Sequence, residues 1–475
     1  MEKTMSVSDI RKAIEQQLQE LEGRYRNRFH LAHRLHRAQV SFQQNRKTST
    51  YRWFHYKEGF SSSLVTNLLT EYRLTGGKIL DPFAGSGTTL FACRDQGVDS
   101  EGIELLPVGQ EIIRARILLE DEMTGEHFQA LAATGQRKDW KTVPGRHPLA
   151  ELNITRGAYP PHIRDAMEQY LAFCQEHTEP LRTVLRFVLL CVLETISYTR
   201  KDGQYLRWDY RAGRRSGEKP FDKGPLADFD RAIQEKIQDI CRDAGRGAVP
   251  GQTAWLPGYG DAPRGKGSIR LHCGSCFDIL PTLEEETCTA IITSPPYCNR
   301  YDYTRIYALE LALLGADELQ LKALRQNLLS CTVENRDKDL LRIKGEWALP
   351  LRLAGQQPLL ASLLDYLHHQ KQQGQLNNSG IPRMVKNYFA ELAIVVFESA
   401  RLLRPDGHLF MVNDNVRYAG VSIPVDLILA DLAEAMGLQV VSILVLPETK
   451  GNSSQQMKIW GRAPLRKCVY VWRKP

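Results

Sequence analysis

The sequence has no apolar run long enough to cross a membrane and no leader-like N-terminus. Its most apolar stretch, 185–193, is interrupted by Arg186 and is too short to span a bilayer. Residues 1–8 lack the apolar core of a signal peptide. The 10 cysteines lack the spacing of a disulfide framework, which favours reduced thiols. These absences predict a cytoplasmic protein without a membrane partner.

Residues with the spacing of a metal site are also lacking. Cys273 and Cys276 have the C-x-x-C spacing, but no second pair follows at a distance typical of zinc sites. His30, His33 and His36 lie close together, yet no nearby acid or cysteine completes a ligand set. We therefore expect no bound metal.

Length and charge set the outer limits of the interpretation. A chain of 475 residues predicts two or three domains, or one domain with large insertions. The 62 Lys and Arg against 55 Asp and Glu give a net charge of +7, which permits a polyanionic partner without requiring one.

Much of this charge lies in the first 50 residues, which contain ten basic and five acidic side chains. A segment with the pattern of a helix carries the arginines Arg24, Arg26, Arg28, Arg34 and Arg37. These side chains fit contacts to a DNA phosphate backbone and fit a solvated helix face equally well.

The tetrapeptide Ser294-Pro295-Pro296-Tyr297 follows the apolar run 288–293, which has the pattern of a buried strand. Two prolines do not donate to a sheet ladder and stiffen the chain as it leaves the strand. The carboxyl end of a strand is where open α/β sheets bind ligands. The loop is suited to a planar, amine-bearing ring, with acceptors for the NH2 group and an aromatic face for stacking.

A glycine-rich segment, 78–90, reads as a short strand, a tight turn and a helix start. Gly85 and Gly87 permit positive φ and a close approach of the backbone to a ligand. A second strand-like piece ends at Glu104, where a Rossmann-like unit places an acid on a ribose hydroxyl. A nucleotide-like cofactor is therefore expected at this turn.

The combination of Asp-Pro-Phe-Ala-Gly-Ser-Gly-Thr-Thr at 81–89, Gly-Ile-Glu at 102–104 and Thr-Ser-Pro-Pro-Tyr at 293–297 resembles the DNA amino-methyltransferase family. Members use S-adenosylmethionine to methylate N4 of cytosine or N6 of adenine. The resemblance implies catalytic roles for Ser294, Pro295, Pro296 and Tyr297.

The resemblance also implies a set of cofactor-binding residues. The glycine-rich set is Asp81, Pro82, Phe83, Ala84, Gly85, Ser86, Gly87, Thr88, Thr89 and Glu104. A segment before this strand folds over the methionine end of the cofactor in the family, which points to Phe60 and Ser61; a helix cap and a core position explain these two residues as well. The usual Gly-Asp of the adenine contact is Gly274-Ser275 in this chain, so Ser275 or Asp278 takes that role.

The resemblance implies a Rossmann-like α/β fold: a seven-stranded, mostly parallel sheet with helices on both faces and an antiparallel last pair. The expected divisions are a basic helical arm (1–50), a cofactor half (51–120), an inserted target-recognition region (121–265), a catalytic half with the Ser-Pro-Pro-Tyr loop (266–315), a helical insertion (316–380) and the end of the sheet (381–475).

Residues 198–215 interleave cations, aromatics and amides, as expected for contacts with DNA bases. A basic surface loop is the alternative. The candidate nucleic-acid contacts are Arg207, Arg211, Arg214, Arg215, Arg300 and Arg305.

The resulting prediction is a prokaryotic, site-specific DNA methyltransferase that acts on double-stranded DNA. Serine at the first loop position favours cytosine N4, because adenine enzymes of the family more often carry aspartate there. A role in restriction-modification or phage defence, beside a cognate endonuclease or defence proteins, is expected. The alternatives are an adenine-N6 enzyme, an RNA base methyltransferase, and a nucleic-acid-binding protein on an inactive methyltransferase fold.

Overall fold

The computed structural model describes residues 6–32, 35–203, 205–214, 220–246, 265–447, 460–461 and 463–475. Its centre is an eight-stranded sheet in the order β1-β11-β12-β8-β7-β2-β3-β6. The strands are β1 (Phe29–Leu31), β2 (Lys78–Asp81), β3 (Asp99–Glu104), β6 (Ile269–Cys273), β7 (Cys288–Thr293), β8 (Leu403–Asp414), β11 (Gln439–Val445) and β12 (Lys467–Arg473). Only β12 runs against its neighbours.

The sheet has one strand more than the expected seven. The additional strand is β1, which pairs in parallel with β11 through Phe29 and Leu31. The arginine-rich segment after residue 25 was expected to be helical, and this expectation is wrong. Helix α1 (Val7–Tyr25) ends before it, and a 3-10 turn, Arg26–Arg28, leads into the strand. The exposed edge of β11 accounts for the difference, because its unpaired backbone groups are available to this segment.

The two faces of the sheet bury alternate residues of the same strands. Ile79, Ile292 and Val471 share a core with α2 (Ser62–Glu71) and α3 (Thr88–Asp95). The alternate residues Leu80, Ile291 and Trp472 point to the opposite face, where they pack with α15 (Ile381–Leu402) and α16 (Val425–Ala435). Helices therefore cover both faces, as expected.

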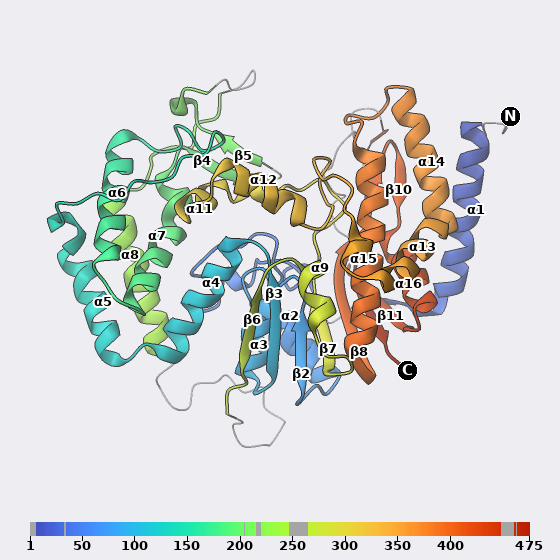
Figure 1. Ribbon diagram of the computed structural model, residues 1–475, viewed down its shortest axis with the longest axis horizontal. Coiled ribbons are helices and arrows are strands. Elements are labelled where there is room, and N and C mark those ends of the chain that lie inside the picture. Colours follow the sequence, from blue (N-terminus) through green and yellow to red (C-terminus); the bar gives the residue numbers. More distant parts are fainter. Residues whose placement is uncertain are drawn as a thin grey trace.

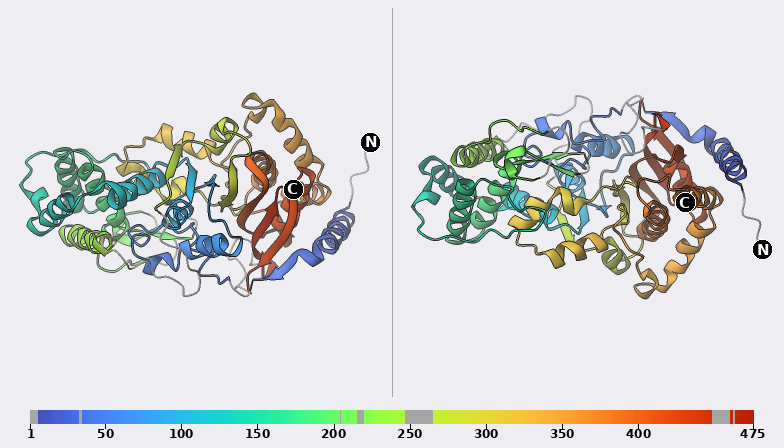
Figure 2. Two further views of the ribbon diagram at one scale, coloured as in Figure 1. Left: turned by 90° about the horizontal axis from the view of Figure 1, so that it is seen from below. Right: turned by 90° about the horizontal axis from the view of Figure 1, so that it is seen from above.

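The first insertion forms a helical body at one end of the sheet, and the C-terminal helices lie at the other end (Figures 1 and 2). The insertion contains α5 (Gly125–Arg137), α6 (Pro161–Gln175), α7 (Leu181–Ile196) and α8 (Phe229–Arg246). These helices share a core with α4 (Pro107–Ile117) and α11 (Ala308–Leu313). A hairpin of β4 (Thr199–Asp202) and β5 (Tyr205–Trp208) connects α7 to the rest of the insertion.

The second insertion supplies α12 (Glu318–Asn327), α13 (Ala348–Gln356) and α14 (Pro358–Gln372). Helix α1 packs against α14 and α16, so the N-terminal arm lies beside the C-terminal part of the chain (Figure 1). The remaining short elements are α9 (Cys276–Ile279), α10 (Tyr303–Ile306), β9 (Val416–Tyr418) and β10 (Val421–Ile423). In the part of the chain that the structure describes, no helix is both long and apolar enough to cross a membrane.

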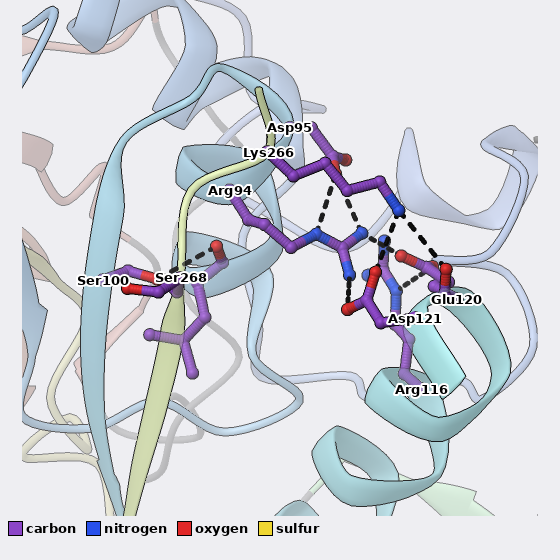
Figure 3. Close-up of polar contacts among 9 residues, drawn as sticks. Arg94, Asp95, Ser100, Arg116, Glu120, Asp121, Lys266 and Ser268 are labelled. Carbon is purple, nitrogen blue, oxygen red and sulfur yellow. Dashed lines mark hydrogen bonds and ion pairs between the residues drawn. The ribbon is translucent and has the colours of Figure 1, made fainter. Parts of the chain in front are cut away.

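A buried ion cluster ties α3 to the first insertion (Figure 3). Arg94 contacts Asp95, Glu120 and Asp121, and Lys266 reaches Asp121 at 2.9 Å. Burial opposes the charge of Glu120, but the guanidinium groups around it outweigh this effect and hold its pKa below the ordinary value. Because breaking a buried pair leaves an uncompensated charge, this cluster fixes the helix that begins at the glycine-rich turn.

Candidate active site

A cavity lies at the carboxyl ends of β2, β3, β6 and β7, the sheet edge at which α/β proteins bind ligands. Its empty volume, including the part open to solvent, is about 750 Å³. Both sequence motifs reach it: the glycine-rich turn lines one part, and Ser294 and Pro296 line another.

Asp81 joins the two motifs below the cavity. Its carboxylate accepts hydrogen bonds from the hydroxyls of Thr89 and Thr293, both at 2.7 Å, and from the backbone N–H of Phe83 at 3.0 Å. Burial raises the pKa of Asp81 to about 6, although these donors pull it down. Asp81 therefore holds β2, α3 and β7 in register at the cavity floor.

Glu104 closes the end of β3 against the glycine-rich turn. One carboxylate oxygen accepts from the Gly85 N–H and the other from the Leu106 N–H, each at 2.6 Å. Burial raises the pKa of Glu104 to about 8, against the effect of these two donors. The carboxylate shapes the turn and also faces the cavity.

The two glycines of the turn have the expected conformation. Gly85 has φ +56° and Gly87 has φ +78°, where L side chains are strained. A Cβ on Gly87 would come within 2.8 Å of Ile113, so side chains are also excluded by space.

The loop after β7 places Ser294 at the cavity wall. Its Oγ lies 3.2 Å from the Val412 carbonyl oxygen and 3.2 Å from the Tyr297 hydroxyl. Tyr297 is half-buried, and Lys467 Nζ lies 5.4 Å from the centroid of its ring. Burial opposes the charge of Lys467, but Tyr297 and Asp414 outweigh burial and raise the pKa of the amine.

A second wall comes from the segment before β2. Glu58 lines the cavity and accepts hydrogen bonds from the hydroxyls of Tyr301 and Tyr307, which follow the Ser-Pro-Pro-Tyr loop. Tyr56 stacks on Tyr307 with ring centroids 5.1 Å apart. The segment before the glycine-rich strand is thereby fixed to the catalytic half.

The cavity has a one-sided charge. Glu58, Asp81 and Glu104 line it, whereas no lysine, arginine or histidine of the described ranges does. Carboxylates in a partly enclosed site favour a cationic ligand, because opposite charges attract more strongly where water is excluded.

Most of the predicted site residues gather at this cavity, and some do not. Those that line it are Phe60, Asp81, Pro82, Phe83, Ala84, Gly85, Ser86, Thr88, Glu104, Ser275, Ser294 and Pro296. Those outside the lining are Ser61, Gly87, Thr89, Asp278, Pro295 and Tyr297. Ser61 is buried, and its hydroxyl donates to the carbonyl oxygens of Ala38 and Ser41.

Several predicted DNA contacts have partners within the protein. Arg211 forms a bidentate pair with Asp209 at 2.7 and 2.9 Å, and Arg214 donates to the Arg156 carbonyl oxygen at 2.8 Å. Arg305 lies 3.9 Å from Asp302.

Arg300 donates to Asn377 at 3.0 Å, and Arg207 donates to Asp202 at 3.2 Å. Arg215 lies outside the described residues. The nucleic-acid roles of these six arginines stay predictions.

The second insertion supplies a wall that the sequence did not indicate. Asn327, Leu328 and Leu329, at the end of α12, line the cavity. No local motif marks them, because their place depends on how the insertion folds back over the sheet. Glu58 was also missed, although it adjoins the segment from which Phe60 was predicted.

Comparisons with known proteins agree with this geometry. A sequence profile of the DNA methylase family matches residues 6–114. Type II methyltransferase M.AvaI of Nostoc sp. is 51% identical over 456 residues, covering 96% of this chain and 92% of the relative. The chain belongs to the DNA amino-methyltransferase family.

This methyltransferase is also 37% identical to Type II methyltransferase M.BsoBI of Geobacillus stearothermophilus over 463 residues, covering 92% of this chain and 88% of the relative. A shorter match, 44% identical over 52 residues, covers 11% of the chain and 10% of Type II methyltransferase M.MjaII of Methanocaldococcus jannaschii. No solved structure matches the chain.

The methyltransferase family uses S-adenosylmethionine, and the residues at the cavity fit this cofactor. The molecule carries a sulfonium and an ammonium group beside one carboxylate, a net charge of +1, and the described residues line the cavity with three acidic side chains and no basic one. Glu104 at the end of β3 and Ser275 at the end of β6 line the cavity, and their contacts to the ribose and the adenine stay predictions.

Proposed function

We propose that this methyltransferase transfers a methyl group to the exocyclic amine of a base in double-stranded DNA, and that the base is cytosine, modified at N4. The observation that carries the proposal is the shared cavity: the glycine-rich turn and Ser294 line one space although they are far apart in the chain. A donor and an acceptor placed there would meet in one crevice.

The proposed chemistry needs acceptors for the amine. If the Ser294 hydroxyl donates to the Val412 carbonyl, its lone pairs stay available for an N–H of the base. The Pro295 carbonyl would accept the second N–H. These bonds draw nitrogen toward tetrahedral geometry and free its lone pair, while positioning supplies several kcal/mol of the barrier reduction.

The cofactor supplies an activated methyl group, and no covalent enzyme intermediate is needed. The amine nitrogen forms a bond to the methyl carbon, the sulfur–carbon bond breaks, and one amine proton is released. Since the base must leave the duplex to reach the cavity, base flipping is part of the proposal. Tyr297 is the aromatic side chain proposed to stack on the flipped base.

Serine at position 294 supports cytosine N4, because adenine enzymes of the family more often carry aspartate there. Adenine N6 is the second candidate. The Type II methyltransferases M.AvaI and M.BsoBI match over most of the chain, which supports a restriction-modification role beside a cognate endonuclease.

The same proposal gives each part of the chain a task. Residues 51–120 and 266–315 hold the cofactor and the reacting base, 121–265 recognise the target, and 381–475 complete the sheet. Residues 316–380 close one side of the cavity through Asn327–Leu329.

The test is a transfer assay with labelled S-adenosylmethionine and separate pools of unmethylated bacterial DNA and of RNA, followed by nucleoside identification. We expect label in DNA as N4-methylcytosine. N6-methyladenine in DNA would favour the second candidate, and label in RNA alone would overturn the DNA assignment. Cofactor binding without transfer to either pool would point to a nucleic-acid-binding protein.

A further inference from the structure

The hairpin β4–β5 has two different faces. Thr199, Lys201 and Leu206 point inward and are buried. Arg200 and Arg207 form a directly opposed cross-strand pair on the outer face. The alternation follows from the two-residue period of a strand, so the outer face is set by the register.

The outer pair is electrostatically unfavourable in the protein alone, since like charges directly opposite each other destabilise a hairpin. Both guanidinium groups stand over the ring of Phe221, with Cζ atoms 4.6 and 4.3 Å from its centroid. They share one carboxylate, Asp202, at 3.8 and 3.2 Å. The arrangement holds two half-exposed cations side by side with incomplete compensation.

Two exposed tyrosines flank this pair. Tyr205 lies on β5 and is 54% exposed, and Tyr210 follows the strand and is 53% exposed. Large aromatic side chains at the surface are typical of binding faces, where their rings stack or pack against a partner.

The inner face fixes the hairpin to the catalytic half. Lys201 forms a buried ion pair with Glu310 of α11, and its Nζ lies 4.3 Å from the ring centroid of Tyr307. The backbone carbonyl of Lys201 accepts a hydrogen bond from Lys57 in the segment before β2. Strand β5 also packs against α10, close to the Ser-Pro-Pro-Tyr loop.

We propose that β4–β5 is a DNA-reading ribbon whose outer face enters the major groove beside the flipped base, with Arg200 and Arg207 on the anionic DNA surface and Tyr205 against the groove wall. A two-stranded ribbon fits the width of the major groove. The Lys201–Glu310 pair sets the ribbon at a fixed position relative to the cavity. This inference rests on the proposed function, and it assigns contacts to Arg200 and Tyr205, which belong to the 198–215 stretch but were not among the named candidate contacts.

The test measures binding of a fluorescent 30-base-pair random duplex pool across a salt series. For Arg200→Gln/Arg207→Gln we expect about 10-fold or greater loss of affinity and a salt slope smaller by about two. The matched control, Arg342→Gln/Arg473→Gln, removes two arginines with exposed or half-exposed side chains, from the segment before α13 and from the end of β12, and leaves both quantities unchanged.

Cofactor affinity and thermal unfolding show whether each variant is folded. If folding fails, Arg200→Lys/Arg207→Lys, which keeps the charge, is compared with Tyr205→Ser. The proposal is supported if the lysine variant keeps a salt slope near that of the wild type and Tyr205→Ser binds the duplex more weakly. If the folded glutamine variant keeps the wild-type affinity and salt slope, the ribbon proposal is overturned, even if the wild-type protein methylates DNA. If the wild-type protein transfers no methyl group, that result counts against the proposed function instead.

Discussion

The cavity and the β4–β5 hairpin lie close together and have opposite electrostatic character. The cavity is lined by Glu58, Asp81 and Glu104 with no basic side chain among the described residues, whereas the hairpin presents Arg200 and Arg207 on its outer face. Such a contrast suits two ligands of opposite charge: a cofactor with a net charge of +1 and a polyanion. Net charge alone, +7 over the chain, conceals it.

The two regions also differ in how their charges are held. Both oxygens of Glu104 accept backbone N–H groups, so the carboxylate is fixed before any ligand arrives. The guanidinium groups of Arg200 and Arg207 lie over the Phe221 ring and share one carboxylate, that of Asp202. A preorganised cavity suits a reaction that depends on alignment, and an undercompensated surface suits a partner that supplies the missing charge.

The largest effect is expected from Ser294→Ala, which changes the chemistry of the cavity without changing its charge. Loss of one acceptor for the amine should lower the single-turnover transfer rate on the order of 100-fold. Cofactor affinity and DNA affinity should stay near wild type, because the hydroxyl contacts only Val412 and Tyr297 in the protein. An unchanged rate would remove Ser294 from the chemistry.

The next effect concerns the charge of the cavity. With its pKa raised to about 8, Glu104 is largely protonated at pH 6.5 in the free protein, and a cationic ligand favours its ionised form. Binding then releases a proton, so cofactor affinity should rise on the order of 10-fold from pH 6.5 to 8.5. Titration calorimetry at both pH values measures this rise.

Glu104→Gln serves as the control for that experiment. It should weaken binding at pH 8.5 and retain only the pH dependence of the ligand itself. If the variant keeps the full wild-type rise, another group is responsible and the charge argument for the cavity fails.

A smaller effect is expected from Lys467→Met, which removes a cation that lies near the cavity but does not line it. Tyr297 loses a cation that stands 5.4 Å from its ring centroid, and a loss of about 1.5 kcal/mol would lower kcat about 10-fold. Cofactor affinity should not weaken. The control is Lys474→Met. The Lys474 amine contacts Glu286 and the Leu403 carbonyl at the other end of β12. Equal losses of kcat in both variants would argue for a general effect on stability.

The smallest effect is expected from Arg214, one of the predicted DNA contacts outside the β4–β5 hairpin. Because Arg214 donates to the carbonyl oxygens of Asn153 and Arg156, Arg214→Ala should change duplex affinity less than about twofold and leave the salt slope unchanged. Fluorescence anisotropy over a salt series measures both. A slope smaller by about one would return Arg214 to the DNA-contacting set.

The parts of the site that were predictable from the sequence are those encoded locally. The strand at 288–293 has the bounds that its apolar run predicted, and every residue in it is buried. Gly85 and Gly87 have the conformation that the glycine-rich pattern requires.

The parts that were missed depend on distant partners. Strand β1 spans only three residues and exists because the edge of β11, late in the chain, accepts it. Asn327–Leu329 reach the cavity through the fold of an insertion whose role had no signal in the sequence.

The most direct test of the account is ultraviolet cross-linking of labelled S-adenosylmethionine to the intact protein, with the attachment sites mapped by mass spectrometry. The account predicts labelled peptides from two regions of the chain. One region is 56–60 or 81–88, and the other is 294–303. Excess S-adenosylhomocysteine should suppress the label in both. Suppressible label elsewhere, such as the second concavity around Tyr72 and His408, with none at these segments would contradict it.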